Sequence, residues 1–200
     1  MPRQAGCRRT TKETRVSVEI DLDGTGRAEV STGIGFFDHL LSSLAHHALF
    51  DLTIVTEGDR EVDDHHTVED TALCLGEALA GALGDRTGIH RFGDARIPMD
   101  EAVAQATVDV GGRPYCLTRL DLTTPYIGNL TTQNIPHALE AFARTSGATV
   151  HVEATGRNDH HVAEAAFKAL ARALRAAVAP DARRAGIAST KGTPTGEAGT

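Results

Sequence analysis

Residues 63–70 read DDHHTVED and residues 158–165 read NDHHVAEA, so the chain carries the same pair of histidines, followed by a glutamate, twice. On a helix, residues i and i+4 share a face, whereas residue i+1 is rotated by about 100°. His65 and Glu69 can therefore bind one ion while His66 points towards another. A single copy of this pattern is more often the polar start of a surface helix. Whether the motif binds metal therefore depends on the rest of the chain.

The surroundings of the two motifs are duplicated as well. FFDHLL precedes the first motif, IPHALE precedes the second, and each segment contributes one histidine. His39 lies 26 residues before His65. His137 lies 23 residues before His160. Such a repeat indicates an internal duplication, which has to be recognised before any single motif is interpreted.

Each half has the same predicted order of elements: strand, strand, helix, strand, helix. In the first half we expect paired strands over 15–32, a helix over 36–49, a strand over 51–56 and a helix from 65 to about 84. In the second half we expect paired strands over 106–122, a helix over 134–147, a strand over 148–156 and a helix over 158–178.

These elements predict an internally duplicated α+β fold. Each half is a mainly antiparallel sheet with two helices packed on one face, and the helices of both halves share a core. Within one catalytic domain, the expected divisions are a flexible N-terminus (1–8), a first half (9–95), a second half (96–188) and a C-terminal STKG segment with a flexible tail (189–200).

The duplicated pattern predicts a metal site, because one buried histidine is ordinary but a repeated constellation is not. Imidazole and carboxylate ligands suit manganese, iron, cobalt, nickel or zinc, and the absence of CxxC spacing argues against a structural zinc site. Acids beside the motifs, including Asp38, are candidates to accept the second imidazole N–H. Six histidines and two glutamates are enough for two ions with four ligands each: His39, His65, His66, Glu69, His137, His160, His161 and Glu164.

Composition narrows the classes of partner and location. The formal net charge is −7 and the lysines and arginines are scattered, which argues against nucleic-acid binding but allows a small anionic ligand. Three widely separated cysteines indicate no disulfide framework. We find no secretory signal and no apolar run of membrane-spanning length, so we expect a cytoplasmic protein with no membrane association.

Seven segments carry a resemblance to a known family. The chain resembles imidazoleglycerol-phosphate dehydratase of histidine biosynthesis from about Arg9 to Gly192. The matching segments are KET (12–14), TGIGFFDHLL (32–41), DDHHTVEDTALCLGEAL (63–79), RFGDARIPMDEA (91–102), GGRPY (111–115), NDHHVAEAAFKALARAL (158–174) and STKG (189–192).

The resemblance implies a lyase that dehydrates D-erythro-1-(imidazol-4-yl)glycerol 3-phosphate to 3-(imidazol-4-yl)-2-oxopropyl phosphate, with two Mn²⁺ per active site. Chemistry explains the two metals, because the proton that leaves is not acidic and hydroxide is a poor leaving group. Metals on both ring nitrogens would allow the imidazole to lose its N–H, and the dimetal-bound imidazolate could then expel the neighbouring hydroxyl.

The resemblance also implies individual roles. Glu13, in the KET segment, is the expected acid–base residue. His65, Glu69, His160 and Glu164 are expected to be catalytic as well, and together with His39 and His161 they bind metal or substrate. The remaining substrate contacts, mostly to phosphate, are expected from His47, Arg91, Arg113, Lys168, Ser189 and Lys191.

Assembly is the last expectation. The pseudo-twofold relation of the halves tends to direct the two ligand clusters away from each other, so we expect metal ligands from neighbouring subunits. The resemblance implies a homo-oligomer of 24 subunits, built from trimers, with active sites at subunit interfaces. Two other functions remain open from the sequence: a dinuclear metallohydrolase acting on a phosphoester, and a non-catalytic metal-binding protein.

Overall fold

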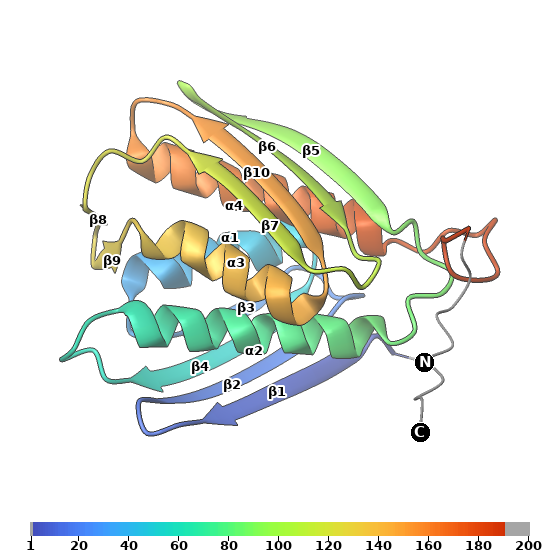
Figure 1. Ribbon diagram of the computed structural model, residues 1–200, viewed down its shortest axis with the longest axis horizontal. Coiled ribbons are helices and arrows are strands. Elements are labelled where there is room, and N and C mark those ends of the chain that lie inside the picture. The colour runs from blue at the N-terminus through green and yellow to red at the C-terminus, as the bar shows by residue number, and fades with distance from the viewer. Residues whose placement is uncertain (1, 191–200) are drawn as a thin grey trace, which may run out of the picture.

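The computed structural model describes residues 2–190 and has two sheets on the outside with the helices between them (Figure 1). Each sheet has four strands, and each half of the chain supplies one sheet and two of the helices. The predicted duplicated α+β architecture is therefore confirmed. No described helix combines the length and hydrophobicity that crossing a membrane requires.

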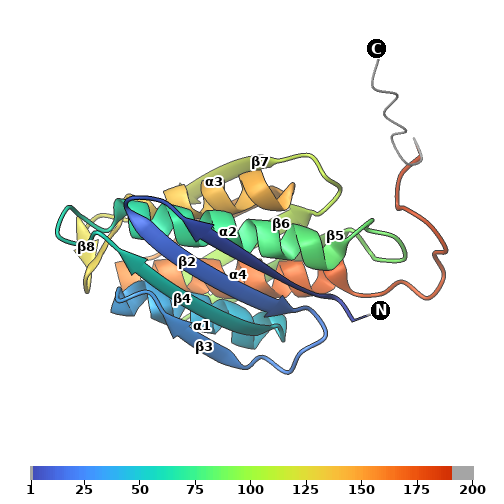
Figure 2. The ribbon, with the colours of Figure 1, turned by 90° about the horizontal axis from the view of Figure 1, so that it is seen from below.

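The first half forms a sheet with strand order β1-β2-β4-β3, which lies in front of its helices in Figure 2. All neighbours are antiparallel except β3 and β4. Buried and exposed residues alternate along β2 and β4, and the buried side chains face the helices, as a sheet covered on one face requires. The elements are β1 (Gln4–Thr10), β2 (Thr14–Asp21), β3 (Ala28–Ser31), α1 (Gly35–Ala48), β4 (Asp51–Gly58) and α2 (His65–Leu83).

The second half repeats this topology with strand order β5-β6-β10-β7. Here β7 and β10 are the parallel pair, equivalent to β3 and β4. A short extra ribbon of two strands, β8 and β9, precedes α3. The elements are β5 (Phe92–Met99), β6 (Ala102–Asp109), β7 (Tyr115–Leu120), β8 (Tyr126–Ile127), β9 (Leu130–Thr131), α3 (Asn134–Ser146), β10 (Thr149–Thr155) and α4 (Asp159–Val178).

The predicted strand pairings within 15–32 and 106–122 are wrong. β4 lies between β2 and β3, and β10 lies between β6 and β7. Alternating side chains indicate which residues face the core, but they do not identify the neighbouring strand. In each half, the strand that follows the first helix takes the central place, because the helix carries the chain over the sheet to a parallel neighbour.

Two strands, β1 and β5, cross boundaries that were expected from the sequence. β1 begins at Gln4, inside the segment 1–8 that was expected to be flexible, and residue 95 lies within β5 rather than at the end of a half. Both are edge strands without a fully buried face, so the sequence marks them weakly: β1 buries only Cys7, and no residue of β5 is fully buried. The halves meet instead in the connection between α2 and β5. There Thr87 and Ile89 form isolated bridges with the chain that follows α4.

The core lies between the sheets, where α1 packs on α4 and α2 packs on α3. α2 and α3 are in close backbone contact at Gly76. A Cβ atom at Gly76 would lie 2.1 Å from the Thr145 hydroxyl, 2.6 Å from the Phe142 carbonyl oxygen and 2.9 Å from the Ser146 nitrogen. Only glycine therefore allows this contact between the two halves.

We predict that Gly76→Ala lowers the free energy of unfolding. Alanine stabilises a helix by about 1 kcal/mol relative to glycine, but overpacking a close backbone contact costs about 1–3 kcal/mol. We expect the steric cost to dominate, with a net loss of up to about 2 kcal/mol in denaturant unfolding at fixed protein concentration. Gly186→Ala is the control, because a Cβ atom there meets nothing within 4 Å. Equal or greater stability of Gly76→Ala would contradict the close contact.

Candidate metal and substrate site

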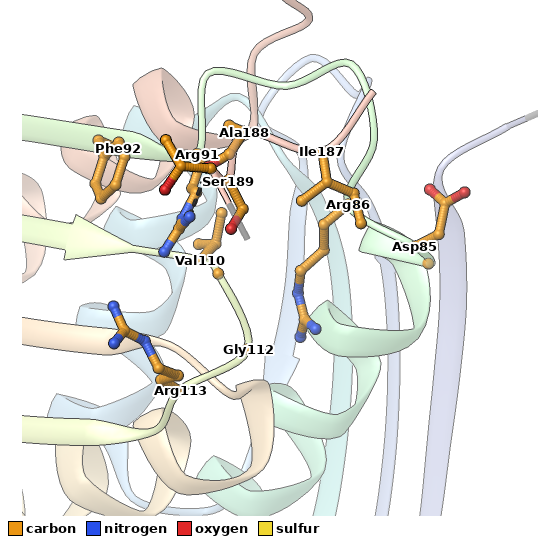
Figure 3. Close-up of a pocket in the computed structure, with 13 residues that line it drawn as sticks. Asp85, Arg86, Arg91, Phe92, Val110, Gly112, Arg113, Ile187, Ala188 and Ser189 are labelled. Carbon is orange, nitrogen blue, oxygen red and sulfur yellow. Dashed lines mark hydrogen bonds between the residues drawn. The ribbon is translucent and has the colours of Figure 1, made fainter. Parts of the chain in front are cut away.

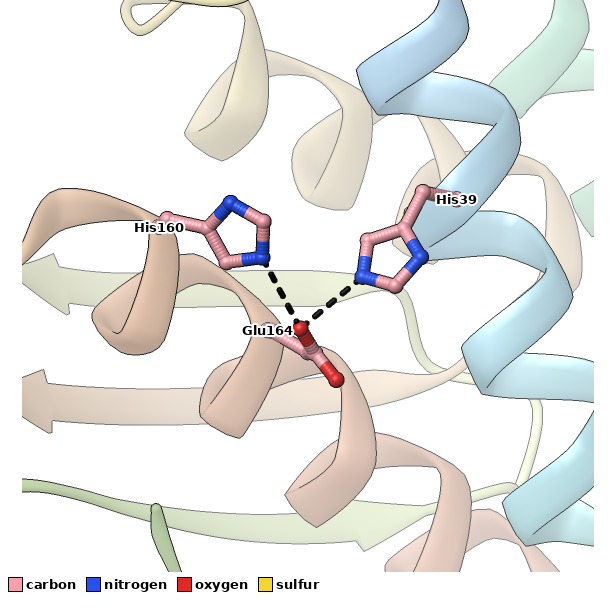
Figure 4. Close-up of side chains that lie close together, drawn as sticks. All are labelled: His39, His160 and Glu164. Carbon is pink, nitrogen blue, oxygen red and sulfur yellow. Dashed lines mark hydrogen bonds and ion pairs between the residues drawn. The ribbon is translucent and has the colours of Figure 1, made fainter. Parts of the chain in front are cut away.

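The first cluster joins α1 to the start of α4 (Figure 4). His160 and Glu164 are one turn apart on α4, and His39 reaches them from α1. One oxygen of Glu164 lies 2.8 Å from His39 Nε2 and 3.1 Å from His160 Nε2. The three ligand atoms converge within 4.8 Å of one another, which is a spacing suited to a shared cation.

The second cluster has the same composition and joins α2 to α3. His65 and Glu69 are one turn apart on α2, and His137 comes from α3. The rings of His65 and His137 stack with centroids 4.7 Å apart. The oxygens of Glu69 lie 3.8 Å from His65 Nε2 and 3.6 Å from His137 Nε2. His137 Nε2 is buried without a hydrogen-bond partner in the described part of the chain, which is unfavourable unless something else binds it.

Each cluster therefore combines both halves of the chain. The first helix of one half supplies a histidine, and the second helix of the other half supplies a histidine and a glutamate. The sequence predicted all six residues but not this exchange between the halves.

His66 and His161 belong to neither cluster, and each is oriented by a carboxylate. His66 Nδ1 lies 3.1 Å from Asp59, and this hydrogen bond raises the pKa of His66. His161 Nδ1 lies 2.9 Å from Glu101, and that hydrogen bond lowers the pKa of Glu101 to about 2. A carboxylate at Nδ1 fixes the ring and leaves Nε2 as the atom for a ligand. The sequence missed both acids, since neither lies in a histidine motif.

The acids next to the motifs cap helices or brace loops instead. Asp63 and Asn158 accept the backbone N–H of His65 and His160, as expected at helix starts. The predicted contact of Asp38 with a histidine is wrong, because its carboxylate accepts hydrogen bonds from Thr32.

Glu13 lies in the turn between β1 and β2, beside His66. Its carboxylate is 4.0 Å from His66 Nε2, and half of the side chain is exposed. The structure thus brings Glu13 to one of the predicted metal ligands, although 52 positions separate the two residues in sequence. No side-chain hydrogen bond fixes Glu13 within residues 2–190, so its carboxylate is available to a substrate.

Lys168 contacts the first cluster, and His47 lies within reach of the Lys168 charge. Lys168 Nζ is 2.7 Å from the second oxygen of Glu164. Burial raises the pKa of Glu164, but the hydrogen bonds from Lys168 and His39 lower it more, to about 2. Burial lowers the pKa of His47, and the positive charge of Lys168 lowers it further.

A cationic pocket of about 700 Å³ lies elsewhere, between the end of α2, the start of β5 and the turn after β6 (Figure 3). Arg91, Arg113 and Ser189 line it, as does Arg86, which the sequence did not single out. Lys191 lies outside the described residues.

Asp109 braces this pocket. Arg91 donates two hydrogen bonds to Asp109, at 2.6 and 2.8 Å, and a third to the Ala188 carbonyl. Three of the five guanidinium N–H groups are thereby used, so within residues 2–190 two remain for an anion. The contact with Ala188 also holds the segment that carries Ser189 against the pocket.

The pocket and the clusters lie at opposite ends of the molecule. All four helices begin at the left of Figure 1, whereas the α2–β5 connection, the β6–β7 turn and the chain after α4 lie at the right. α2 has 19 residues and therefore extends about 28 Å. No single small ligand can span that distance.

Known proteins match this chain over most of its length. The family model of imidazoleglycerol-phosphate dehydratase matches residues 32–174. Proteins of that name from Nocardioides sp. and Methanosarcina mazei are 53% and 54% identical; the matches cover 96% and 92% of this chain and 99% and 96% of theirs. Solved structures of the dehydratase from Pyrococcus furiosus and Staphylococcus aureus are 35% and 31% identical, each with a TM-score of 0.80; they cover 93% and 88% of this chain and 99% of each of theirs.

The low pKa of Glu164 gives a prediction for the metal-free protein. Because the folded pKa lies below the ordinary 4.5, this carboxylate stabilises the fold above about pH 4.5, and the contribution is lost as the pH falls towards 2. Lys168→Met removes the strongest hydrogen bond and keeps the packing. We expect the stability difference between wild type and variant to be largest above pH 5 and to shrink towards pH 2 in thermal unfolding with chelator.

The matched control is Arg119→Met, which breaks an exposed ion pair with Glu153. Exposed pairs contribute little, so this variant should resemble wild type at every pH. A difference for Lys168→Met that does not change with pH would contradict the assigned cause.

Proposed function

The chain belongs to the imidazoleglycerol-phosphate dehydratase family of hydro-lyases, and we propose that it dehydrates D-erythro-1-(imidazol-4-yl)glycerol 3-phosphate with two Mn²⁺ ions at each active site. The product is 3-(imidazol-4-yl)-2-oxopropyl phosphate, an intermediate of histidine biosynthesis. The observation that carries the metal dependence is the pair of matching clusters, each with two histidines and one glutamate.

The donor sets fit a divalent metal such as manganese. Each cluster offers two imidazole nitrogens and a carboxylate, and the buried Nε2 of His137 gains a partner if a cation binds there. His39, His160 and Glu164 would hold one ion, and His65, Glu69 and His137 the other. Bound metal would lower the pKa of the substrate's imidazole N–H, as it does for other bound ligands.

Three protein ligands per cluster leave a place for a fourth. His66 and His161 are already oriented through Nδ1, and neither belongs to one of the two clusters of two histidines and one glutamate; His161 lies instead with Asp100 and Glu101. We infer that the Nε2 atoms of these two histidines complete the clusters of neighbouring subunits. Six histidines and two glutamates then serve two ions.

Binding of the substrate's phosphate also requires residues from more than one subunit. The proposed phosphate-binding residues are Arg91, Arg113, Ser189 and Lys191. Arg91, Arg113 and Ser189 line the pocket at the end of the molecule away from the clusters. The substrate has an imidazole and a three-carbon phosphate ester, far shorter than the roughly 28 Å of α2. A complete site therefore needs the pocket of one subunit beside the clusters of others, with Lys168 on the cluster side.

A closed homo-oligomer provides such interfaces repeatedly. The resemblance of the sequence to the family suggests 24 subunits built from trimers, and we keep that number as part of the proposal.

The duplication supports Glu13 as the acid–base residue. Glu13 and Glu101 both lie in the turn before the second strand of their half. Glu101 is committed to His161 and to the backbone N–H of Asn158. In the first half, Asp59 takes the corresponding place at His66, which leaves the carboxylate of Glu13 on the Nε2 side, where a substrate would bind. His47 is a further proposed substrate contact.

Turnover of imidazoleglycerol phosphate tests the function directly. We expect the ketone product with manganese, none after chelation, and recovery when manganese is restored. The phosphate should stay on the product, because release of inorganic phosphate would instead indicate a phosphoester hydrolase. No turnover by the metal-loaded oligomer would leave only a non-catalytic metal-binding role.

A mixing experiment tests shared sites. His65→Ala and His160→Ala should each lose metal and be inactive alone. After the two variants are dissociated and reassembled together, about a quarter of the sites would combine two intact clusters if each site uses two different subunits. Activity should therefore recover to about that fraction. No recovery in particles shown by mass to contain both chains would contradict the sharing of sites.

Glu13→Gln tests the acid–base role. The amide keeps the size of the side chain but cannot exchange a proton at neutral pH, so kcat should fall by about a hundredfold or more. Metal content, particle size and KM should change little. A near wild-type kcat would exclude Glu13 from proton transfer.

A further inference from the structure

Asp70 is a buried acid that the proposed reaction does not use. It lies on α2 directly after Glu69, and only 6% of it is exposed. We propose that Asp70 is a positioning residue, which holds the β1–β2 turn so that Glu13 stays beside His66. This inference rests on the proposed function, in which Glu13 transfers the proton.

Asp70 binds both sides of the turn. Arg9, near the end of β1, donates a hydrogen bond from Nε to one carboxylate oxygen at 2.8 Å. Thr14, the first residue of β2, donates its hydroxyl to the other oxygen. Glu13 lies between these two anchors, so its backbone is fixed to α2 from both strands.

Further hydrogen bonds make the turn itself rigid. The Thr11 hydroxyl accepts the backbone N–H groups of Glu13 and Thr14, at 3.1 and 3.0 Å. The Asp59 N–H donates to the Glu13 carbonyl at 3.1 Å. His66 and Asp70 are four residues apart on one face of α2, so the helix holds the histidine and the anchor of the glutamate together.

The duplicated half shows that the helix needs no acid at this position. Ala165 follows Glu164 where Asp70 follows Glu69, and Ala102 begins its strand where Thr14 begins β2. Both alanines are buried. The corresponding β5–β6 turn is shorter, because Met99 pairs directly with Ala102. The buried Asp70–Thr14 pair thus occurs only in the half whose turn carries Glu13.

The second half also supplies the test variant. Asp70→Ala alone leaves the buried Thr14 hydroxyl without its acceptor and can destabilise the fold. The double variant Asp70→Ala/Thr14→Ala copies the Ala165 and Ala102 pair, so it removes the buried hydrogen bond together with its donor and its acceptor. Arg9 also loses its partner, but its side chain is partly exposed and can be hydrated. We expect it to assemble and to bind metal as the wild type does.

Two readouts distinguish positioning from stability. Hydrogen exchange at the amides of residues 12–14 should become faster in the double variant, while α2 keeps its protection. With manganese and imidazoleglycerol phosphate, kcat should fall by about a hundredfold with little change in KM, since a small misplacement of a reacting group can cost that much. Thr14→Ser keeps the hydroxyl and should retain most of the wild-type kcat.

Coupling to Glu13 is the decisive measurement. If Asp70 acts through Glu13, adding Glu13→Gln to the double variant causes no further loss of kcat, because both changes remove the same contribution. Independent, multiplying losses would overturn the proposal. So would a wild-type kcat in the double variant, or a loss of metal that accounts for the whole decrease.

Glu57→Gln is the matched control, because it breaks an exposed ion pair with Arg15 on the same sheet. Its exchange rates and kcat should equal those of wild type. Inactivity of the wild-type enzyme would count against the proposed function, whereas an active wild type with unaffected anchor variants would count against Asp70 alone.

Discussion

The structure depends on the packing of unlike helices from the two halves, α1 on α4 and α2 on α3. Neither half holds both histidines and the glutamate of either described cluster. His39 needs Glu164 from the other half, and His137 needs Glu69. The same contacts bury the apolar faces of all four helices between the sheets. The packing that forms the core therefore also positions the histidines and glutamates of the two clusters. Gly76 shows how close the helices must come.

The duplication is nearly symmetric in topology but not in chemistry. Both halves place a glutamate before their second strand and a pair of histidines at a helix start. In one half the glutamate orients its histidine; in the other an aspartate does so, and the glutamate is left beside the ring. The two equivalent turns therefore differ: Glu101 supports a histidine, whereas the carboxylate of Glu13 has no side-chain hydrogen bond within residues 2–190.

The sequence predicted the helices and six of the clustered residues, because i and i+4 spacing and the repeat express local geometry. It could not predict the strand neighbours, since β4 and β10 enter between strands that are closer in sequence. It also missed Asp59, Glu101 and Asp109, whose partners are set by tertiary packing. The resemblance to the family identified Arg91 and Arg113, but nothing in the sequence indicated that they lie at the far end from His65.

The distance between the cationic pocket and the clusters has a genetic consequence. If every active site takes parts from several subunits, a chain defective at both ends would damage sites on different neighbours. A cell that expresses such an allele beside a normal one would lose more activity than the fraction of defective chains, so the defective chains would interfere with the normal ones. Alleles defective at only one end would instead complement each other. The inheritance pattern of histidine auxotrophy would thus report which end of the molecule a mutation affects.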